Sequence, residues 1–149
     1  MILLPDLTDL VDYIVRHYSS ATKIVEVGVG WFPNVALELK KRLKNTKIIV
    51  VDINHSIINT YRDDFKNIEC FQDDLFEPKG RIYKSASLIY SIRPPPELHE
   101  IITELGINVK ADVLIRPLDR ECLSAGTKTR KFSLINNGKT SFYVTFFQK

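Results

Sequence analysis

The sequence is short of the residues that build metal sites and disulfide frameworks. It has two cysteines, Cys70 and Cys122, which stand far apart in the chain and form no paired motif. The three histidines do not fall at metal-ligand spacings either. We therefore predict no metal, and we expect both cysteines to be small buried hydrophobes in a reducing, cytoplasmic environment.

Long apolar runs and a strong excess of one charge are also missing. The first ten residues, MILLPDLTDL, have no basic leader, so no signal peptide is predicted. No apolar stretch approaches the roughly 18 residues of a membrane span. The net charge of +3 is too small to indicate a dedicated nucleic-acid binder. We expect a soluble, cytoplasmic protein with no membrane partner.

What is present is an ordinary globular composition, with 44% hydrophobic and 26% charged residues in 149. This length fits one domain, 1–149, with residues 1–20 forming an N-terminal helix packed on it. Strand-like and helix-like patterns alternate up to residue 118, and an Asn-Gly hairpin signal closes the chain. Such alternation is typical of a doubly wound, mostly parallel α/β sheet, here of about seven strands.

The predicted elements follow from apolar periodicity, proline and glycine. Residues 118–128 are predicted to be a loop with one helical turn. Helices are predicted at 6–18, 33–44, 55–65 and 97–105, the last ended by Gly106; strands at 23–28, 47–52, 68–72, 87–92 and 111–117; and a hairpin at 131–135 and 140–147.

The stretch VEVGVGWFPN, residues 25–34, joins the first predicted strand to the next helix. Gly28 and Gly30 permit a tight turn and close approach of a ligand, or they serve the turn alone. Asp52 ends the second strand at a spacing suited to accepting hydrogen bonds from ribose hydroxyls. The alternative is that Asp52 only caps the helix that follows.

The residues around the glycines discriminate between ligands. Glu26 would repel the pyrophosphate of a dinucleotide, and Pro33 stands where a third glycine would allow close helix packing. A cationic adenosyl ligand without phosphate suits the acid better. S-adenosylmethionine, with an ammonium and a sulfonium, is therefore favoured over NAD.

VEVGVG, the acid in VVDIN, and FQDDLF resemble the first three motifs of class I S-adenosylmethionine-dependent methyltransferases. The resemblance covers nearly the whole chain and implies a minimal methyltransferase-like fold with strand order 3-2-1-4-5-7-6. More closely, the chain resembles a short uncharacterised archaeal family in which YSIRPP is a signature.

The resemblance implies a role for each matching residue in binding the cofactor. Gly28 and Gly30 would lie against the methionine part and Asp52 would accept from the ribose. Asp74 would meet the adenine amino group with Leu75 packing near the base, and Asp73 is the alternative to Asp74.

The segment YSIRPPPEL departs from the family pattern. Amino-methylating members carry Asn or Asp before Pro-Pro, whereas this chain has Arg93, which only donates hydrogen bonds. Arg116 ends the next predicted strand, so both arginines are expected on one edge as a site for an anion. The alternative is that they form internal ion pairs with Glu97, Asp119 or Glu121.

No catalytic residue is evident, and the candidates are Arg93 and His99. His99 would act as a base, or it lies on the solvent face of its helix. The favoured function is a methyltransferase for a small or anionic acceptor, such as a nucleotide, a phosphorylated metabolite or RNA. The alternatives are a non-catalytic nucleotide- or RNA-binding module and, third, an NAD-dependent oxidoreductase.

Overall fold

A computed structural model of the chain describes residues 5–117 and 132–147. The predicted loop at 118–128 and Cys122 lie outside these residues. The strands are β1 (Lys23–Val27), β2 (Lys47–Asp52), β3 (Glu69–Gln72), β4 (Leu88–Ile92), β5 (Asp112–Arg116), β6 (Ser133–Asn137) and β7 (Thr140–Thr145). The helices are α1 (Pro5–His17), α2 (Asn34–Arg42), α3 (His55–Asp64), α4 (Gly80–Tyr83), the 3-10 helix η1 (Pro96–Leu98) and α5 (His99–Val109).

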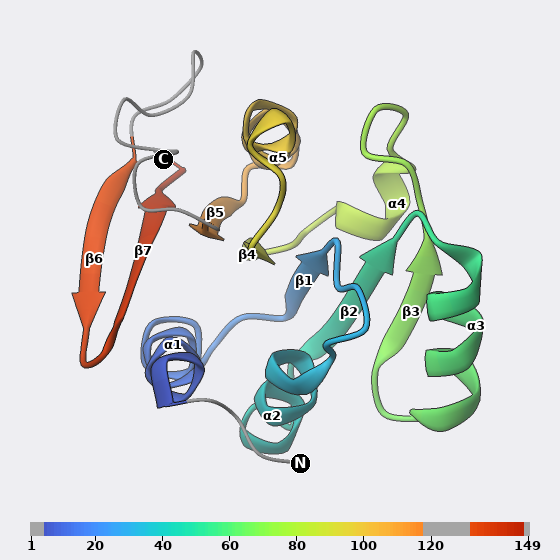
Figure 1. Cartoon of the computed structure of the whole chain (residues 1–149), viewed down its shortest axis with the longest axis horizontal. Helices are drawn as coiled ribbons and strands as arrows, with labels where there is room; N and C mark the ends of the chain where they lie inside the picture. The colour runs from blue at the N-terminus through green and yellow to red at the C-terminus, as the bar shows by residue number, and fades with distance from the viewer. Residues whose placement is uncertain (1–4, 118–131, 148–149) are drawn as a thin grey trace.

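The seven strands form one sheet in the order β3-β2-β1-β4-β5-β7-β6 (Figure 1). Strands β1 to β5 pair in parallel, and β7 runs antiparallel to both β5 and β6. This confirms the predicted fold class and strand order. The carboxyl ends of the parallel strands therefore share one edge, which is where ligands bind in sheets of this kind.

Helices cover both faces of the sheet. Figure 1 shows α1 and α2 on one side of it and α4 and α5 on the other. Within β1, Ile24 packs into the hydrophobic cluster under α1, α2 and α3, while Val25 and Val27 pack into the cluster under α4 and α5. Burial on both faces explains why β1 and β2 read as nearly continuous apolar runs.

The C-terminal hairpin is hydrogen-bonded to α1. Its two-residue loop begins with Gly138, whose φ of +62° is the conformation that the Asn-Gly signal predicted for this turn. The backbone N–H of Lys139 donates to the Asp9 carboxylate at 2.6 Å, and the Asn137 amide donates to the Asp9 carbonyl at 2.7 Å. These contacts hold the first turns of α1 against the hairpin.

One helix boundary was predicted wrongly. Gly106 does not end its helix, because α5 continues to Val109 and is capped by Lys110 in the left-handed conformation, with φ of +64°. A Cβ on Gly106 would collide with the Cγ2 of Val113. Glycine is needed there because α5 lies close to β5. The short helix α4 was not predicted, and the free thiol of Cys70 is buried as expected.

Candidate functional site

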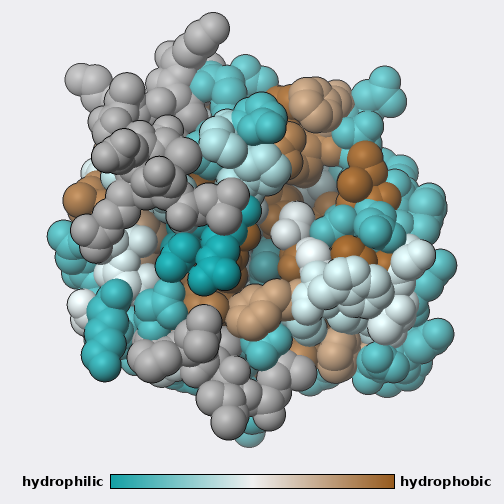
Figure 2. All heavy atoms as spheres, viewed as in Figure 1, coloured by the Kyte–Doolittle hydropathy of each residue, from teal (hydrophilic) through white to brown (hydrophobic). Residues whose placement is uncertain are grey.

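The carboxyl ends of β1 to β4 surround a cavity of about 380 Å³. This volume falls in the range of roughly 300–1,000 Å³ that is typical of small-molecule sites. On the outer surface, hydrophobic and hydrophilic residues lie side by side around a hollow near the centre of the face in Figure 2. The cavity is lined by Gly28, Val51, Asp52, Ile53, Asp73, Asp74, Leu75, Phe76, Pro95 and Leu98.

Asp52 connects the end of β2 to the glycine turn. One carboxylate oxygen accepts from the backbone N–H of Gly30 at 2.8 Å, and the other accepts from Asn54 at 3.0 Å. Asn54, not Asp52, caps α3, because its side chain accepts from the N–H of Ser56 at 2.8 Å. The alternative that Asp52 only caps the helix after β2 is therefore wrong. Asp52 is half-buried and lines the cavity.

Both glycines of the turn adopt the left-handed conformation, with φ of +68° at Gly28 and +59° at Gly30. Residues with a Cβ rarely adopt this conformation, so the turn requires glycine whatever it binds. Gly28 lines the 380 Å³ cavity. Gly30 does not line it and instead directs its N–H at Asp52.

The two adjacent acids after β3 differ in their surroundings. Asp73 is 2% exposed and is held by the Tyr83 hydroxyl at 2.6 Å and by the backbone N–H of Lys79. Asp74 is less buried and accepts from the N–H of Phe76 through one oxygen, at 2.9 Å. Both acids line the cavity, and Asp74 has more capacity left for a ligand.

Five apolar residues of the cavity wall were not among the predicted site residues: Val51, Ile53, Phe76, Pro95 and Leu98. Ile53 and Phe76 are 61% and 67% exposed, although both are large hydrophobic side chains. Each directly or nearly follows an acid at the end of a strand, and that placement is the signal that could have identified them. Exposed apolar surface at the mouth of a cavity suits a planar ring such as a nucleobase.

A second, smaller cavity of about 110 Å³ lies beside the first, at the ends of β1 and β4. We call it the Glu26 chamber; its lining residues are Leu7, Glu26, Val29, Phe32, Ile92 and Arg93. At two places, residues close in sequence line different cavities. Gly28 lines the larger cavity and Val29 the chamber, and Pro95 lines the larger cavity and Arg93 the chamber.

Glu26 is 1% exposed and lies at the centre of the sheet. The pKa of its carboxyl is raised from 4.5 to about 8, and burial is the largest cause. The hydrogen bond from the Tyr90 hydroxyl at 2.7 Å opposes this rise, and the nearby Asp52 carboxylate adds to it. The carboxyl is therefore largely protonated at neutral pH without a ligand. A cation in the chamber would favour the ionised form.

The two arginines of the predicted anion site lie together but differ in their partners. The backbone N–H of Arg93 donates to the carbonyl of Arg116 at 2.6 Å. The guanidinium of Arg116 pairs with Asp6 of α1 at 2.9 Å, a partner that the sequence did not indicate. Arg93 forms no ion pair with any residue in the described parts of the chain, and it lines the Glu26 chamber.

His99 is buried, at 4% exposed, so the predicted solvent-face alternative is wrong. Burial lowers the pKa of its imidazole, opposed by a hydrogen bond to the Pro94 carbonyl. Its Nε2 has no hydrogen-bond partner among the described residues. His99 lines neither of the two cavities, so its role as a base stays a prediction without a contact to the site.

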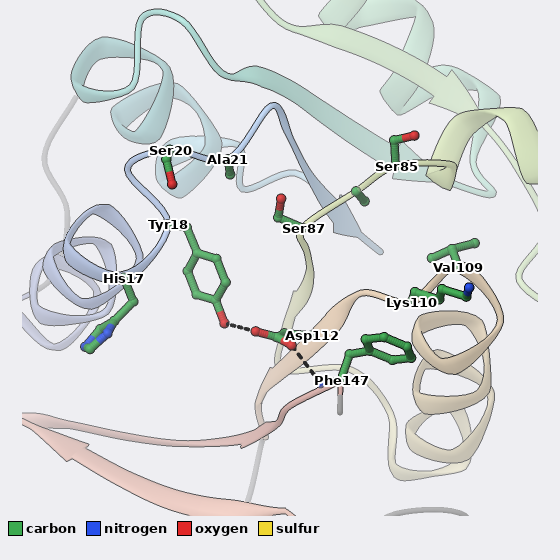
Figure 3. Close-up of a pocket in the computed structure, with 11 residues that line it drawn as sticks. His17, Tyr18, Ser20, Ala21, Ser85, Ser87, Val109, Lys110, Asp112 and Phe147 are labelled. Atoms are coloured by element: carbon green, nitrogen blue, oxygen red, sulfur yellow. Dashed lines mark hydrogen bonds between the residues drawn. The ribbon is translucent and has the colours of Figure 1, made fainter. Parts of the chain in front are cut away.

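The opposite edge of the sheet carries a larger hollow of about 460 Å³, between the end of α1, the start of β5 and Phe147 (Figure 3). Its carboxylate, Asp112, accepts from the Tyr18 hydroxyl and from the N–H of Phe147, each at 2.7 Å (Figure 3). These bonds tie Tyr18, just after α1, and Phe147, which follows β7, to the start of β5. None of the predicted site residues lies here, and the hollow is at the amino ends of the strands, away from the edge where such sheets bind ligands.

Two further features concern the described residues 5–117 and 132–147. They contain no cluster of three or more His, Cys, Asp or Glu side chains placed to hold a metal ion. Their helices are too short or too polar to cross a bilayer.

A family model described as an uncharacterised protein family, UPF0146, matches residues 7–146. This chain belongs to UPF0146. A UPF0146 protein of Methanothermobacter thermautotrophicus is 36% identical over 135 residues, covering 91% of each chain. One of Pyrococcus furiosus is 38% identical over 136 residues, covering 91% of this chain and 96% of the other. The predicted archaeal family is thereby confirmed.

Solved structures similar to this UPF0146 chain are methyltransferases. The METTL16 methyltransferase domain superposes with a TM-score of 0.69 at 10% identity, covering 96% of this chain and 82% of that one. TrmN from Thermus thermophilus gives 0.62 at 15% identity, covering 91% of this chain. This chain spans only 46% of the length of TrmN. At these identities the likeness establishes the fold.

Proposed function

We propose that this UPF0146 protein binds S-adenosylmethionine and transfers its methyl group to a small or anionic acceptor. The observation that carries the proposal is the convergence of Gly28, Asp52, Asp74 and Leu75, chosen from sequence, on one cavity at the carboxyl edge of the sheet. Similarity of fold to methyltransferases supports it, including one solved in complex with S-adenosylmethionine.

Each part of the ligand has a counterpart in the site. Asp52 would accept from the ribose hydroxyls with the lone pairs that Gly30 and Asn54 leave unused. Asp74 would accept from the adenine amino group, and Ile53 and Phe76 would border the base. Glu26 beneath the turn would ionise beside a bound cation, so it favours a cationic ligand over the pyrophosphate of NAD.

Binding is tested by thermal shift and calorimetry with S-adenosylmethionine, S-adenosylhomocysteine and NAD. Ligand at 100 times its Kd stabilises a protein by about 2.7 kcal/mol, which raises Tm by several degrees at this chain length. We expect a shift with the two sulfur ligands and none with NAD. Asp52→Asn should abolish it, and Asp63→Asn, an exposed acid on α3, is the matched control. No shift with either sulfur ligand contradicts the proposal.

A second candidate is a binding module without turnover. It is favoured by Arg93, which replaces the acceptor-orienting Asn or Asp of amino-methylating enzymes and cannot accept a hydrogen bond. Methyl transfer needs mainly positioning of the reactants, so a missing base does not decide the question. Transfer of a labelled methyl group to nucleotide, phosphorylated-metabolite or RNA pools would support the enzyme, and binding without transfer would support the module.

A further inference from the structure

The 460 Å³ hollow at the amino edge of the sheet is larger than the 380 Å³ cavity at the carboxyl edge. Its volume falls within the roughly 300–1,000 Å³ of small-molecule sites. It is built by the end of α1 with the residues that follow, the turn before β4, the end of α5, the start of β5, and Phe147 (Figure 3). Side chains from separate elements therefore face one space that has no part in the proposed methyl transfer.

A carboxylate without an ion pair lines this hollow. Asp112 is half-buried, and no cationic nitrogen of residues 5–117 or 132–147 lies within 4.0 Å of its oxygens. Each oxygen accepts one hydrogen bond, from the Tyr18 hydroxyl or from the N–H of Phe147. A carboxylate has about four acceptor sites, so Asp112 retains about two for donors of a ligand.

Three serine hydroxyls add neutral donors and acceptors. Ser20, Ser85 and Ser87 line the hollow, and their hydroxyls form no hydrogen bond with any residue in the two described ranges. Ser87 is half-buried, and its backbone is fixed by bonds to the Lys23 carbonyl at 2.9 Å and from the Asp112 N–H at 3.1 Å. Because hydroxyls both donate and accept, they complement a ligand that carries hydroxyls of its own.

Two of the lining residues stand where glycine would be easier to accommodate. Ser85 follows the end of α4 with φ of +69°, and Lys110 caps α5 with φ of +64°. Glycine is the usual residue in the left-handed conformation after a helix, since a Cβ makes it costly. Here the chain has a hydroxyl and an ammonium, and both side chains line the hollow.

The charges and the aromatic ring limit the kind of ligand. Asp112 opposes an anion beside it, and Lys110 opposes a cation. A neutral ligand with several hydroxyls avoids both costs, because adjacent hydroxyls donate to the carboxylate and others accept from the ammonium. The half-buried ring of Phe147 lies next to Asp112 and offers an apolar surface to the C–H groups of such a ligand (Figure 3).

We propose that the hollow binds a sugar ring through a vicinal diol, with Asp112 accepting from the diol, Ser87 bonding to a ring hydroxyl and Phe147 packing against the ring. The site is separate from the adenosyl cavity, which lies at the opposite edge of the sheet, so the proposal does not depend on the proposed function. The same diol occurs in free sugars and in the ribose of nucleotides.

The test compares methyl β-D-ribofuranoside with its 2-deoxy analogue, which lacks one hydroxyl of the diol. Titration of the ¹⁵N-labelled full chain should give saturable amide shifts at Ser85, Ser87 and Asp112 with the ribofuranoside, at a Kd on the order of 1–10 mM. The deoxy analogue should bind about tenfold more weakly, because it loses a charge-assisted hydrogen bond. Inorganic phosphate should shift none of these amides.

Glycine variants separate binding from stability. Ser85→Gly and Lys110→Gly remove a side chain from the hollow but relieve the positive φ, so Tm should rise by about 2–4 °C. Affinity for the ribofuranoside should nevertheless fall about twofold to tenfold in each. Ser87→Ala should weaken it by a similar factor. Ser19→Ala, at an exposed serine outside the hollow, is the control and should leave the affinity unchanged.

Asp112→Asn keeps an acceptor for Tyr18 and removes the charge, so it should weaken the ribofuranoside about tenfold to hundredfold. Circular dichroism shows whether this variant folds, and the glycine variants decide the question if it does not. Uridine 5′-monophosphate extends the ribofuranoside by a base and a phosphate. Tighter binding of it in the hollow identifies a nucleotide as the source of the diol, and equal or weaker binding identifies a free sugar.

Several results would overturn the proposal. These are equal binding of the two ribofuranosides, no saturable shift in wild type, and unchanged affinity in both Lys110→Gly and Ser87→Ala. Shifts centred on the Gly28 turn would place the sugar in the other cavity, and shifts with phosphate alone would make the hollow an anion site. Failure of S-adenosylhomocysteine to bind would affect only the proposed function, because no step of this test uses that ligand.

Discussion

The hydroxyl of Tyr90 on β4 donates a hydrogen bond of 2.7 Å to the carboxyl of Glu26 on β1. Both side chains are almost completely buried, and their residues are directly paired in the sheet. The bond satisfies one oxygen of an acid placed under the glycine turn. It also couples β1, which leads into the glycine turn, to β4, which Arg93 directly follows.

Loss of this bond should destabilise the protein. Tyr90→Phe leaves the Glu26 carboxyl without its donor in the core, and we expect a loss of about 1–3 kcal/mol in the free energy of unfolding, measured with urea. In a Glu26→Leu background the same change should cost much less, because no acceptor remains. Equal costs in both backgrounds would show that the hydrogen bond contributes nothing.

Stability should fall as pH rises through the neutral range. The pKa of Glu26 is raised from 4.5 to about 8 in the folded chain, so the folded state holds a proton that the unfolded state loses above pH 4.5. This contribution to the free energy of unfolding is complete below pH 4.5 and is lost as pH rises through 8. The loss is about 1.4 kcal/mol per pH unit, and the total loss is at most a few kcal/mol. Urea melts across this window should slope downward for wild type and less for Glu26→Gln. Identical slopes would contradict the assignment.

Gly106→Ala should destabilise α5 even though alanine is the better helix former. The added methyl group meets Val113, and overpacking of this kind costs about 1–3 kcal/mol, more than the propensity gain of about 1 kcal/mol. Asn108→Ala, at an exposed position of the same helix, should be neutral or slightly stabilising. Val113→Ala should offset part of the Gly106→Ala loss, whereas additive losses would place the clash elsewhere.

The Arg116–Asp6 pair should hold the start of α1 to the sheet. With side chains 21% and 24% exposed, Asp6→Asn should cost about 1 kcal/mol, and less in 1 M salt, where the screening length is about 3 Å. Asp12 is also on α1 and pairs with Arg42 of α2, and the side chains of Arg42 and Asp12 are 38% and 40% exposed. Because this pair is more exposed, Asp12→Asn should cost less. Chemical denaturation at low and high salt measures both; a larger loss for Asp12→Asn would contradict the ranking.

Local sequence pattern was sufficient to predict the buried strands and the strand-to-helix turn. Apolar runs such as KIIVVD fix a strand buried on both faces, and Gly28 and Gly30 after KIVEV indicate a strand-to-helix turn. Asp52 follows from its spacing to that turn. These signals concern burial and backbone conformation, which neighbouring residues largely determine, so the elements and the edge that carries the cavity could be predicted. The strand order was implied by the resemblance to the methyltransferase family.

The choice of partners depended on how separate elements pack. Asp6 pairs with Arg116 across 110 positions of sequence, and the acids expected to pair with it did not include Asp6. Burial of His99 and the need for glycine at 106 likewise depend on how close α5 lies to the sheet. The sequence by itself determined the fold and indicated Gly28, Asp52, Asp74 and Leu75, which line the 380 Å³ cavity. Only the tertiary structure showed that Arg93 lies beside Glu26 with no ion pair to any acid of residues 5–117 or 132–147, because charges select partners by distance in space and not along the chain.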